Sequence, residues 1–226
     1  MTLADLIRRF RAMAKDEYTP YLWSDAFVTD KLNDAQVEAV VRGRLLLEDA
    51  NAAMCSIAVT AGQASYTLHA KLYELVRVAF KPAGTTKSML LSIVTREWLD
   101  NRFDDWRDWI GQDSSVLRFV IQDEGRLRMV PAPATDGQLM IEAYRLPLAS
   151  MTADSDEPEI HEASQEHLIE YAMAFAFRVP DAESFDPNRA QDAEDKFAEH
   201  FGLPVSSDLR RSTREDVQQL TAVYPS

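Results

Sequence analysis

The sequence predicts an α+β protein made of a helical bundle, an inserted antiparallel β-rich domain and an extended C-terminal arm. Three observations predict this class. Apolar residues recur with helical spacing at both ends of the chain, the middle has the spacing of strands, and the last 22 residues have no periodicity. We therefore expect residues 1–55 and 148–203 to form one helical domain, residues 56–147 the β-rich insert and residues 204–226 the arm.

Two helices are expected before the insert. Residues 2–15 place Leu3, Leu6, Ile7 and Phe10 on one face, as in an amphipathic helix. A second helix is expected to begin near Thr29 or Asp30 and to run to about residue 51. Its apolar positions are too broad for one stripe, which predicts burial on two sides, in a bundle or at a subunit contact. These positions are Leu32, Val37, Val40, Val41, Leu45 and Leu47.

The insert is predicted from short runs rich in β-branched and aromatic residues. Strands are expected at residues 56–60, 64–68, 73–80, 89–94, 116–121, 126–130 and 138–145. Glycine-containing turns at residues 62–63, 123–125 and 135–137 predict hairpins between successive strands. One helix is expected within the insert, over residues 95–110, with Thr95 as its N-cap and Leu99, Phe103, Trp106 and Ile110 on one face.

Two helices are expected after the insert. The first covers about residues 163–178 and is apolar nearly all round beyond Leu168, so it is expected to be buried in this chain or against a neighbour. The second covers about residues 187–200, with Pro187 in its first turn and Gly202 and Pro204 ending it.

Composition and charge exclude several classes of function. The 226 residues carry a net charge of −13, and residues 148–203 hold 14 acidic and only 3 basic groups. This balance argues against a stable nucleic-acid binder and against docking on an anionic membrane. We expect no transmembrane helix and no signal peptide. The single Cys55 excludes an internal disulfide and a cysteine-cluster metal site.

Patterns that resemble catalytic or metal motifs fail on their spacing. His161 and His167 are six residues apart, which places them about 120° apart on a helix, whereas a zincin needs a spacing of four. Asp104, Asp105 and Asp108 lie beside tryptophans, but neighbouring helical carboxylates diverge and nothing predicts a raised pKa. Ser56 lacks a nucleophile elbow, and no glycine-rich phosphate loop is present. The sequence therefore predicts no catalytic residue, no metal site and no cofactor.

The order of several ordinary residues over about residues 23–180 resembles a known family. The residues that carry the resemblance are Trp23, Asp25, Leu32, Asn33, Ala35, Glu38, Ala39, Gly62, Tyr66, Leu68, Trp98, Leu127, Pro131, Ala132, Pro133, Gly137, Leu139, Tyr144, Arg145, Leu146, Pro147, Glu157, Pro158, Glu159 and Ile160. This order resembles the head-to-tail adaptor, or connector, proteins of tailed bacteriophages, especially the portal-attached tail adaptors of short-tailed phages.

The resemblance implies a structural protein of the virion neck. It implies a ring, with twelve copies expected, that lies below the portal protein, extends the DNA channel and supports the assembly of tail or nozzle proteins. DNA would pass through without specific binding, and no membrane would be involved. Two alternatives stay open: a tail or baseplate module that recognises a protein or a glycan, and a cell-wall hydrolase.

Two sets of residues are the candidate functional groups. An acidic channel would repel DNA phosphates, and solubility alone is the competing explanation of the acidity. The candidates for the channel are Asp154, Asp156, Glu157, Glu159, Glu162, Glu166 and Glu170. The arm combines arginines with apolar anchors, which suits an interface, and the resemblance implies that terminal arms grip the portal. Its candidates for contact with the portal or a neighbouring subunit are Leu209, Arg210, Arg211, Arg214, Val217, Leu220, Val223 and Tyr224.

Overall fold

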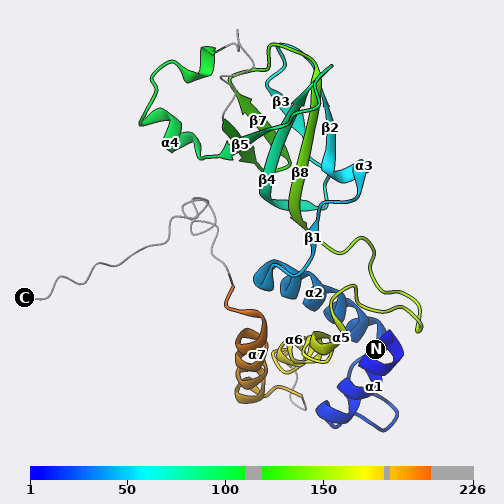
Figure 1. Ribbon diagram of the computed structural model, residues 1–226. Helices are drawn as coiled ribbons and strands as arrows, with labels where there is room; N and C mark the ends of the chain where they lie inside the picture. Colours follow the sequence, from blue (N-terminus) through cyan, green and yellow to red (C-terminus); the bar gives the residue numbers. More distant parts are fainter. Residues whose placement is uncertain (110–118, 181–183, 205–226) are drawn as a thin grey trace, which may run out of the picture. The chain divides into compact units, whose positions relative to one another are not determined.

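The computed structural model describes residues 1–109, 119–180 and 184–204, which have a mixed α+β fold (Figure 1). The chain divides into two compact units. The helical unit contains residues 1–47 and 145–204, and the β unit contains residues 48–144. The strand β1 lies at the boundary between the two.

The helical unit contains α1 (Leu3–Ala14), α2 (Asp25–Gly43), α5 (Glu162–Gln165), α6 (Leu168–Ala176) and α7 (Pro187–Phe201). The β unit contains α3 (Ala52–Cys55), α4 (Arg96–Asp100) and the 3-10 turn η1 (Trp106–Asp108). The strands are β1 (Leu47–Glu48), β2 (Ser56–Val59), β3 (Ser65–Thr67), β4 (Leu72–Pro82), β5 (Met89–Ile93), β6 (Phe119–Asp123), β7 (Arg126–Val130) and β8 (Gly137–Arg145).

The first two helices are defined by their caps. A capping box of Thr2 and Asp5 begins α1, close to its predicted start. The helix α2 begins earlier than predicted, because the Ser24 side chain accepts a hydrogen bond from the Phe27 N–H and caps the helix there. It also ends earlier, at Gly43, followed by Arg44 in the left-handed conformation. Within the single chain Leu32 and Val40 are buried, whereas Val37, Leu45 and Leu47 are exposed, so a second buried side at these three residues stays a prediction of a subunit contact.

The helix α6 lies at the centre of the helical unit and packs against α1, α2 and α7. Seven of its nine residues are buried, so its apolar surface is covered within the chain, the first of the two possibilities considered. The helix expected over residues 163–178 is divided into α5 and α6 at Glu166 and His167, whose carbonyl oxygens accept from the N–H groups of Ile169 and Glu170 three residues on. The last helix, α7, begins with Pro187 and ends before Gly202, as predicted.

The sheet of the β unit is curled into a half-barrel with the strand order β1-β8-β4-β5-β6-β7-β3, and β2 also pairs with β8. The predicted hairpin of β6 and β7 is confirmed, with Gly125 at its turn at a φ of 67°. The other two predicted hairpins are wrong. The strand β2 pairs with β8 and β3 with β7, so the turn at residues 61–63 joins strands with different partners.

The prediction of a wholly antiparallel insert is wrong for one pair, since β5 and β6 are parallel. Parallel neighbours need a long crossover connection, and the segment that contains α4 provides it. Thr95 caps α4 as predicted, its Oγ1 accepting from the Trp98 N–H at 3.1 Å, but α4 ends at Asp100 and only η1 follows. Ile110 and residues 116–118, which the predictions also used, lie outside the described residues.

A close backbone approach fixes the start of β8. A Cβ on Gly137 would lie 2.5 Å from the Lys81 carbonyl oxygen and 2.6 Å from the Phe80 ring. Phe80 is fully buried in the core of the β unit, where Val78, Leu127 and Leu139 are also buried. Only glycine fits between β4 and the start of β8 without displacing one of them.

Candidate interaction surfaces

A buried arginine holds the loop that follows α1. The Arg11 side chain is 8% exposed, and its Nη1 donates to Asp16 Oδ2 at 2.7 Å. Its Nη2 donates to the Trp23 carbonyl oxygen at 3.2 Å and to the Asp25 carboxylate. The Asp16 carboxylate in turn accepts from the backbone N–H groups of Leu22 and Trp23. These bonds fix both ends of the loop of residues 15–24, because a buried charge needs several partners.

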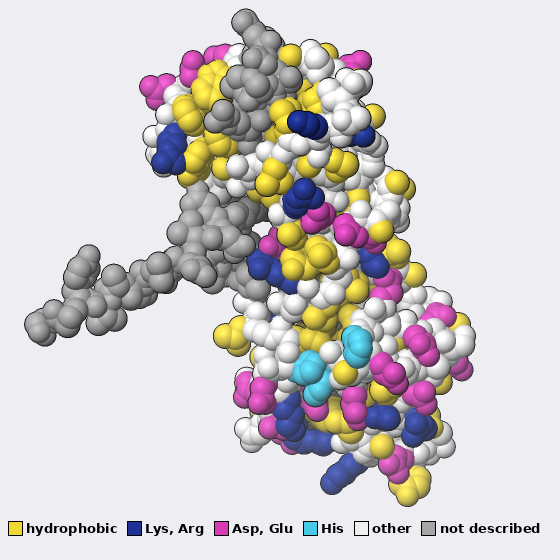
Figure 2. All heavy atoms as spheres, in the orientation of Figure 1, with side chains coloured by type: hydrophobic (Ala, Val, Ile, Leu, Met, Phe, Trp, Pro, Cys, Tyr) yellow, Lys and Arg dark blue, Asp and Glu magenta, His cyan; other side chains and the backbone are white. Residues whose placement is uncertain are grey.

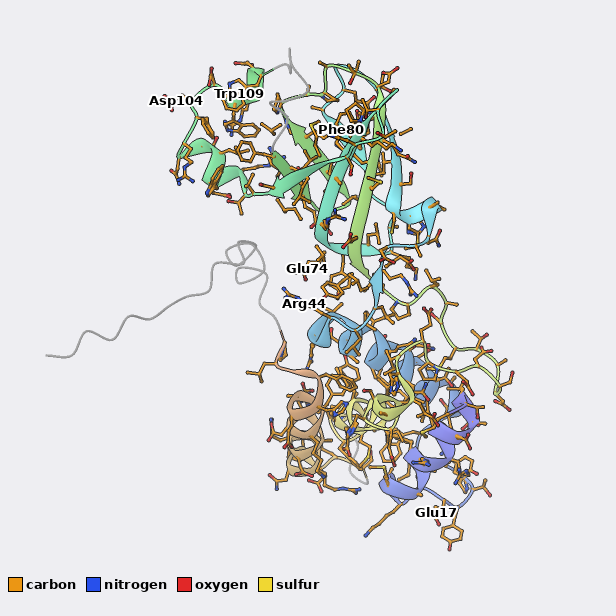
Figure 3. The ribbon with its side chains drawn as sticks, viewed as in Figure 1. Glu17, Arg44, Glu74, Phe80, Asp104 and Trp109 are labelled. Carbon is orange, nitrogen blue, oxygen red and sulfur yellow. The ribbon has the colours of Figure 1, made fainter. Side chains whose placement is uncertain are left out.

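This loop exposes aromatic and apolar side chains. Tyr18 is 85% exposed, Tyr21 42% and Leu22 52%. The Arg11 guanidinium lies 3.5 Å from the centre of the Tyr21 ring, a cation–π contact that orients the ring. Figure 3 shows Glu17 at the turn beyond α1, among the side chains of this loop. Exposed aromatic residues on a fixed loop resemble the anchors of protein interfaces.

A groove of about 720 Å³ lies between α1, the start of α2 and residues 152–154. Leu3, Ala4, Ile7 and Ala26 contribute apolar lining, and Tyr21 forms part of one side. Charged side chains surround this lining, namely Arg8, Arg9, Arg11, Glu17, Asp25 and Asp154. The volume is large enough for several side chains of a bound segment.

The acidic connection before α5 is fastened to α2 by buried polar side chains. The Asn33 amide forms two hydrogen bonds with the backbone of Met151, of 2.8 and 3.0 Å. The Gln36 side chain is 2% exposed and accepts from the Glu159 N–H at 2.6 Å. An acidic segment therefore has a defined position on the helical unit rather than that of a free linker.

Two histidines stack where α6 begins and α7 ends. The rings of His167 and His200 are 3.7 Å apart at 18°, and His200 Nε2 lies 3.2 Å from Ser164 Oγ. Burial and the neighbouring His167 hold the pKa of His200 below 6.5.

An aromatic cluster lies beside α4 in the β unit. The rings of Trp98, Phe103, Trp109 and Phe119 contact one another with centroids 4.9 to 6.3 Å apart. All four are partly buried, and Trp106 beneath them is 1% exposed. Figure 3 shows Trp109 and Asp104 on the segment that follows α4.

Residues 1–220 match the model of the SU10 adaptor protein family. The chain belongs to this family. It is therefore a structural adaptor protein of a phage, associated with the virion and with other phage proteins. No curated protein matches the adaptor.

The predicted channel carboxylates of the adaptor fall into three groups. Three are occupied by hydrogen bonds or ion pairs within the helical unit. Asp156 accepts from the Thr152 and Ala153 N–H groups at 2.7 and 2.8 Å, which holds the pKa of its carboxyl below the usual value. Glu159 pairs with Arg145 at 2.6 Å, and Glu166 pairs with Arg9 at 2.7 Å. Glu170 is half-buried, and burial raises the pKa of its carboxyl.

The remaining three carboxylates, Asp154, Glu157 and Glu162, are exposed. Within the described part of the chain, no ion pair is found for their side chains. Figure 2 shows acidic and basic side chains interspersed on the visible surface of the helical unit. The arm residues Leu209, Arg210, Arg211, Arg214, Val217, Leu220, Val223 and Tyr224 lie outside the described residues.

The histidines at positions 161 and 167 have structural roles in the adaptor. His161 caps α5, its Nδ1 accepting from the Ala163 N–H, and His167 stacks on His200. Within the described residues, no group of three or more His, Cys, Asp or Glu side chains is arranged to hold a metal ion. In the same residues, the structure has no helix with both the length and the apolar character needed to span a membrane.

Sequence reasoning missed the Arg11 network and the groove beside it. One signal was available, because Arg11 falls four residues after Ile7 and next to Phe10, at the edge of the apolar face of α1. A cation at such a position needs a carboxylate from elsewhere in the fold, and Asp16 lies within the next turn and a half of chain.

Proposed function

We propose that the adaptor forms a ring below the portal protein, with twelve copies, that extends the DNA channel and supports the assembly of tail or nozzle proteins. The family match over residues 1–220 carries this proposal. The charge supports it, because a chain of net charge −13 gives a ring of strongly negative field that DNA can cross without binding.

The proposal assigns a separate role to each part of the chain. In this proposal the helical unit is the body of the ring, the β unit is an insert, and the arm of residues 204–226 attaches the ring to the portal. Among the predicted channel carboxylates, Glu157 and Glu162 are the ones we place along the channel. Both are exposed, and neither has an ion-pair partner within the described residues.

Electron microscopy of the purified adaptor, alone and mixed with the portal protein of the same phage, tests the assembly. We expect a ring attached to one end of the portal. Adaptor that stays monomeric at every concentration and forms no ring on the portal would contradict the proposal. Deleting residues 205–226 should leave the far-ultraviolet circular dichroism of the helices intact and weaken attachment to the portal.

The channel placement has its own test. Glu157→Gln with Glu162→Gln should increase the retention of double-stranded DNA by the ring in an electrophoretic assay at low salt. The matched control is Glu97→Gln with Glu124→Gln, which removes the same charge from exposed positions of the β unit. Equal retention of DNA by both variants would contradict the placement of Glu157 and Glu162 along the channel.

A further inference from the structure

The groove of the helical unit carries an inference about the arm. We infer that this groove binds residues 209–214 of a neighbouring copy of the adaptor. The inference rests on the proposed ring, because it requires a neighbouring copy, and it assigns the start of the arm to a defined site. Residues 217–224 then remain available to contact the portal.

The charge of the groove favours a cationic segment. Each arginine around it is already paired: Arg8 with Asp5 at 3.2 Å, Arg9 with Glu166 at 2.7 Å and Arg11 with Asp16 at 2.7 Å. By contrast, Glu17 and Asp154 have no ion-pair partner among the described residues. The side chains of the groove that have no ion-pair partner among the described residues are therefore negative, and they attract positive groups from outside the unit.

The shape of the groove favours a segment that also carries an apolar side chain. Ile7 and Tyr21 are partly exposed, and Ala4 and Ala26 leave open space beside them. Because Arg11 and its carboxylates hold the Tyr21 loop in place, little ordering of the groove is needed when a segment binds.

The arm contains such a segment. Residues 209–214 read Leu-Arg-Arg-Ser-Thr-Arg, with three guanidinium groups, one apolar anchor and no carboxylate. A guanidinium forms two parallel hydrogen bonds with a carboxylate, which suits Glu17 and Asp154. Leu209 suits the apolar lining between them.

Chain length favours a neighbouring copy over the adaptor's own groove. A Cβ on Gly202 would lie 3.9 Å from the Arg42 carbonyl oxygen, so α7 ends beside the last turn of α2. The groove lies at the other end of α2, and the 13 residues from Thr29 to Arg42 span about 20 Å. Leu209 follows Gly202 by seven residues, at most about 24 Å of extended chain. Even along a straight line, reaching its own groove would use most of that length, whereas the proposed ring offers each arm the groove of a neighbouring copy.

Photo-crosslinking in the full-length adaptor tests the inference directly. We would replace Leu209 with p-benzoylphenylalanine, mix copies grown in ¹⁴N and ¹⁵N media before assembly on the portal, irradiate, and identify the crosslinked peptides by mass spectrometry. We expect crosslinks between light and heavy chains at Ile7, Tyr21 or Ala26. Crosslinks confined to single chains, crosslinks elsewhere, or no crosslinks would overturn the inference.

Charge exchange gives a second readout. Glu17→Arg with Asp154→Arg should reduce the groove crosslink at least tenfold, and adding Arg210→Glu with Arg211→Glu should restore it. Glu199→Arg with Asp195→Arg on α7 is the control and should leave the crosslink unchanged. Electron microscopy of the same samples separates the two proposals, because rings without a groove crosslink refute only this inference, whereas absence of rings refutes the proposed function as well.

Discussion

The Arg11 network makes the sharpest stability prediction. Replacing Arg11 with Met leaves the Asp16 carboxylate, whose side chain is 3% exposed, without its cation. Breaking a buried pair from one side costs about 3–5 kcal/mol, and the lost contact with the Tyr21 ring adds about 0.5–1 kcal/mol. We therefore expect Arg11→Met to lower the free energy of unfolding of the helical unit by about 4–5 kcal/mol.

Two controls separate burial from charge. Arg8→Met makes the same chemical change on the same helix, but Arg8 is 71% exposed and pairs with a half-exposed Asp5, so we expect a loss below about 1 kcal/mol. Asp25→Asn removes the second partner of Arg11, and its side chain is 67% exposed, so we again expect less than about 1 kcal/mol.

Urea unfolding followed by ¹⁹F NMR of the 5-fluorotryptophan-labelled protein would measure these losses. Trp23 is the only tryptophan of the helical unit, and it packs edge-on against Phe10 and Phe177 at 5.8 and 5.5 Å. Its signal therefore reports the unit that contains Arg11. Losses for Arg11→Met and Arg8→Met that agree within 1 kcal/mol would refute the reasoning.

Three further predictions concern other parts of the chain. Gly137→Ala should destabilise the β unit by about 1–3 kcal/mol in urea, because the new Cβ meets the Lys81 carbonyl, whereas Gly43→Ala meets only the flexible Leu45 side chain and should cost less. Because the pKa of His200 is lowered in the folded state, the stability that this group contributes is complete above pH 6.5 and is lost as the pH falls below it. The urea midpoint should accordingly drop towards pH 5, and His200→Gln should flatten this drop. Asp186→Ala removes the cap that accepts from the Asn188 and Arg189 N–H groups at 3.1 Å, which should cost about 1 kcal/mol, and Asp186→Ser should restore it.

Local signals predicted the elements that local interactions define. The helix α7 begins at Pro187 and ends before Gly202, and the β6–β7 hairpin turns at Gly125, because backbone preferences decide each of these points. The predicted start of α2, near Thr29 or Asp30, is too late because apolar spacing does not locate a helix end, whereas the Ser24 cap does.

The sequence alone does not predict which strands pair when they are far apart in the chain. Ser56 pairs with Met140 and Ser65 with Arg128, and no turn residue between β2 and β3 indicates partners so distant in the chain. The groove depends on the same kind of information, since Ile7 and Asp154 come together only when the two ends of the chain fold as one unit. The net negative charge of residues 148–203 can be counted from the sequence. The hydrogen bonds and ion pairs of Asp156, Glu159 and Glu166 cannot be predicted from it.

The chain leaves the helical unit and returns to it at one place. The Arg145 N–H donates to the Leu46 carbonyl oxygen at 2.9 Å, so the two crossings are held side by side by a backbone hydrogen bond. Adjacent ends are what allow one module to be inserted into another without stretching either. A two- or three-residue turn could therefore replace residues 48–144, and β units of different sequence could be exchanged among related adaptors at this junction while the helical scaffold is kept.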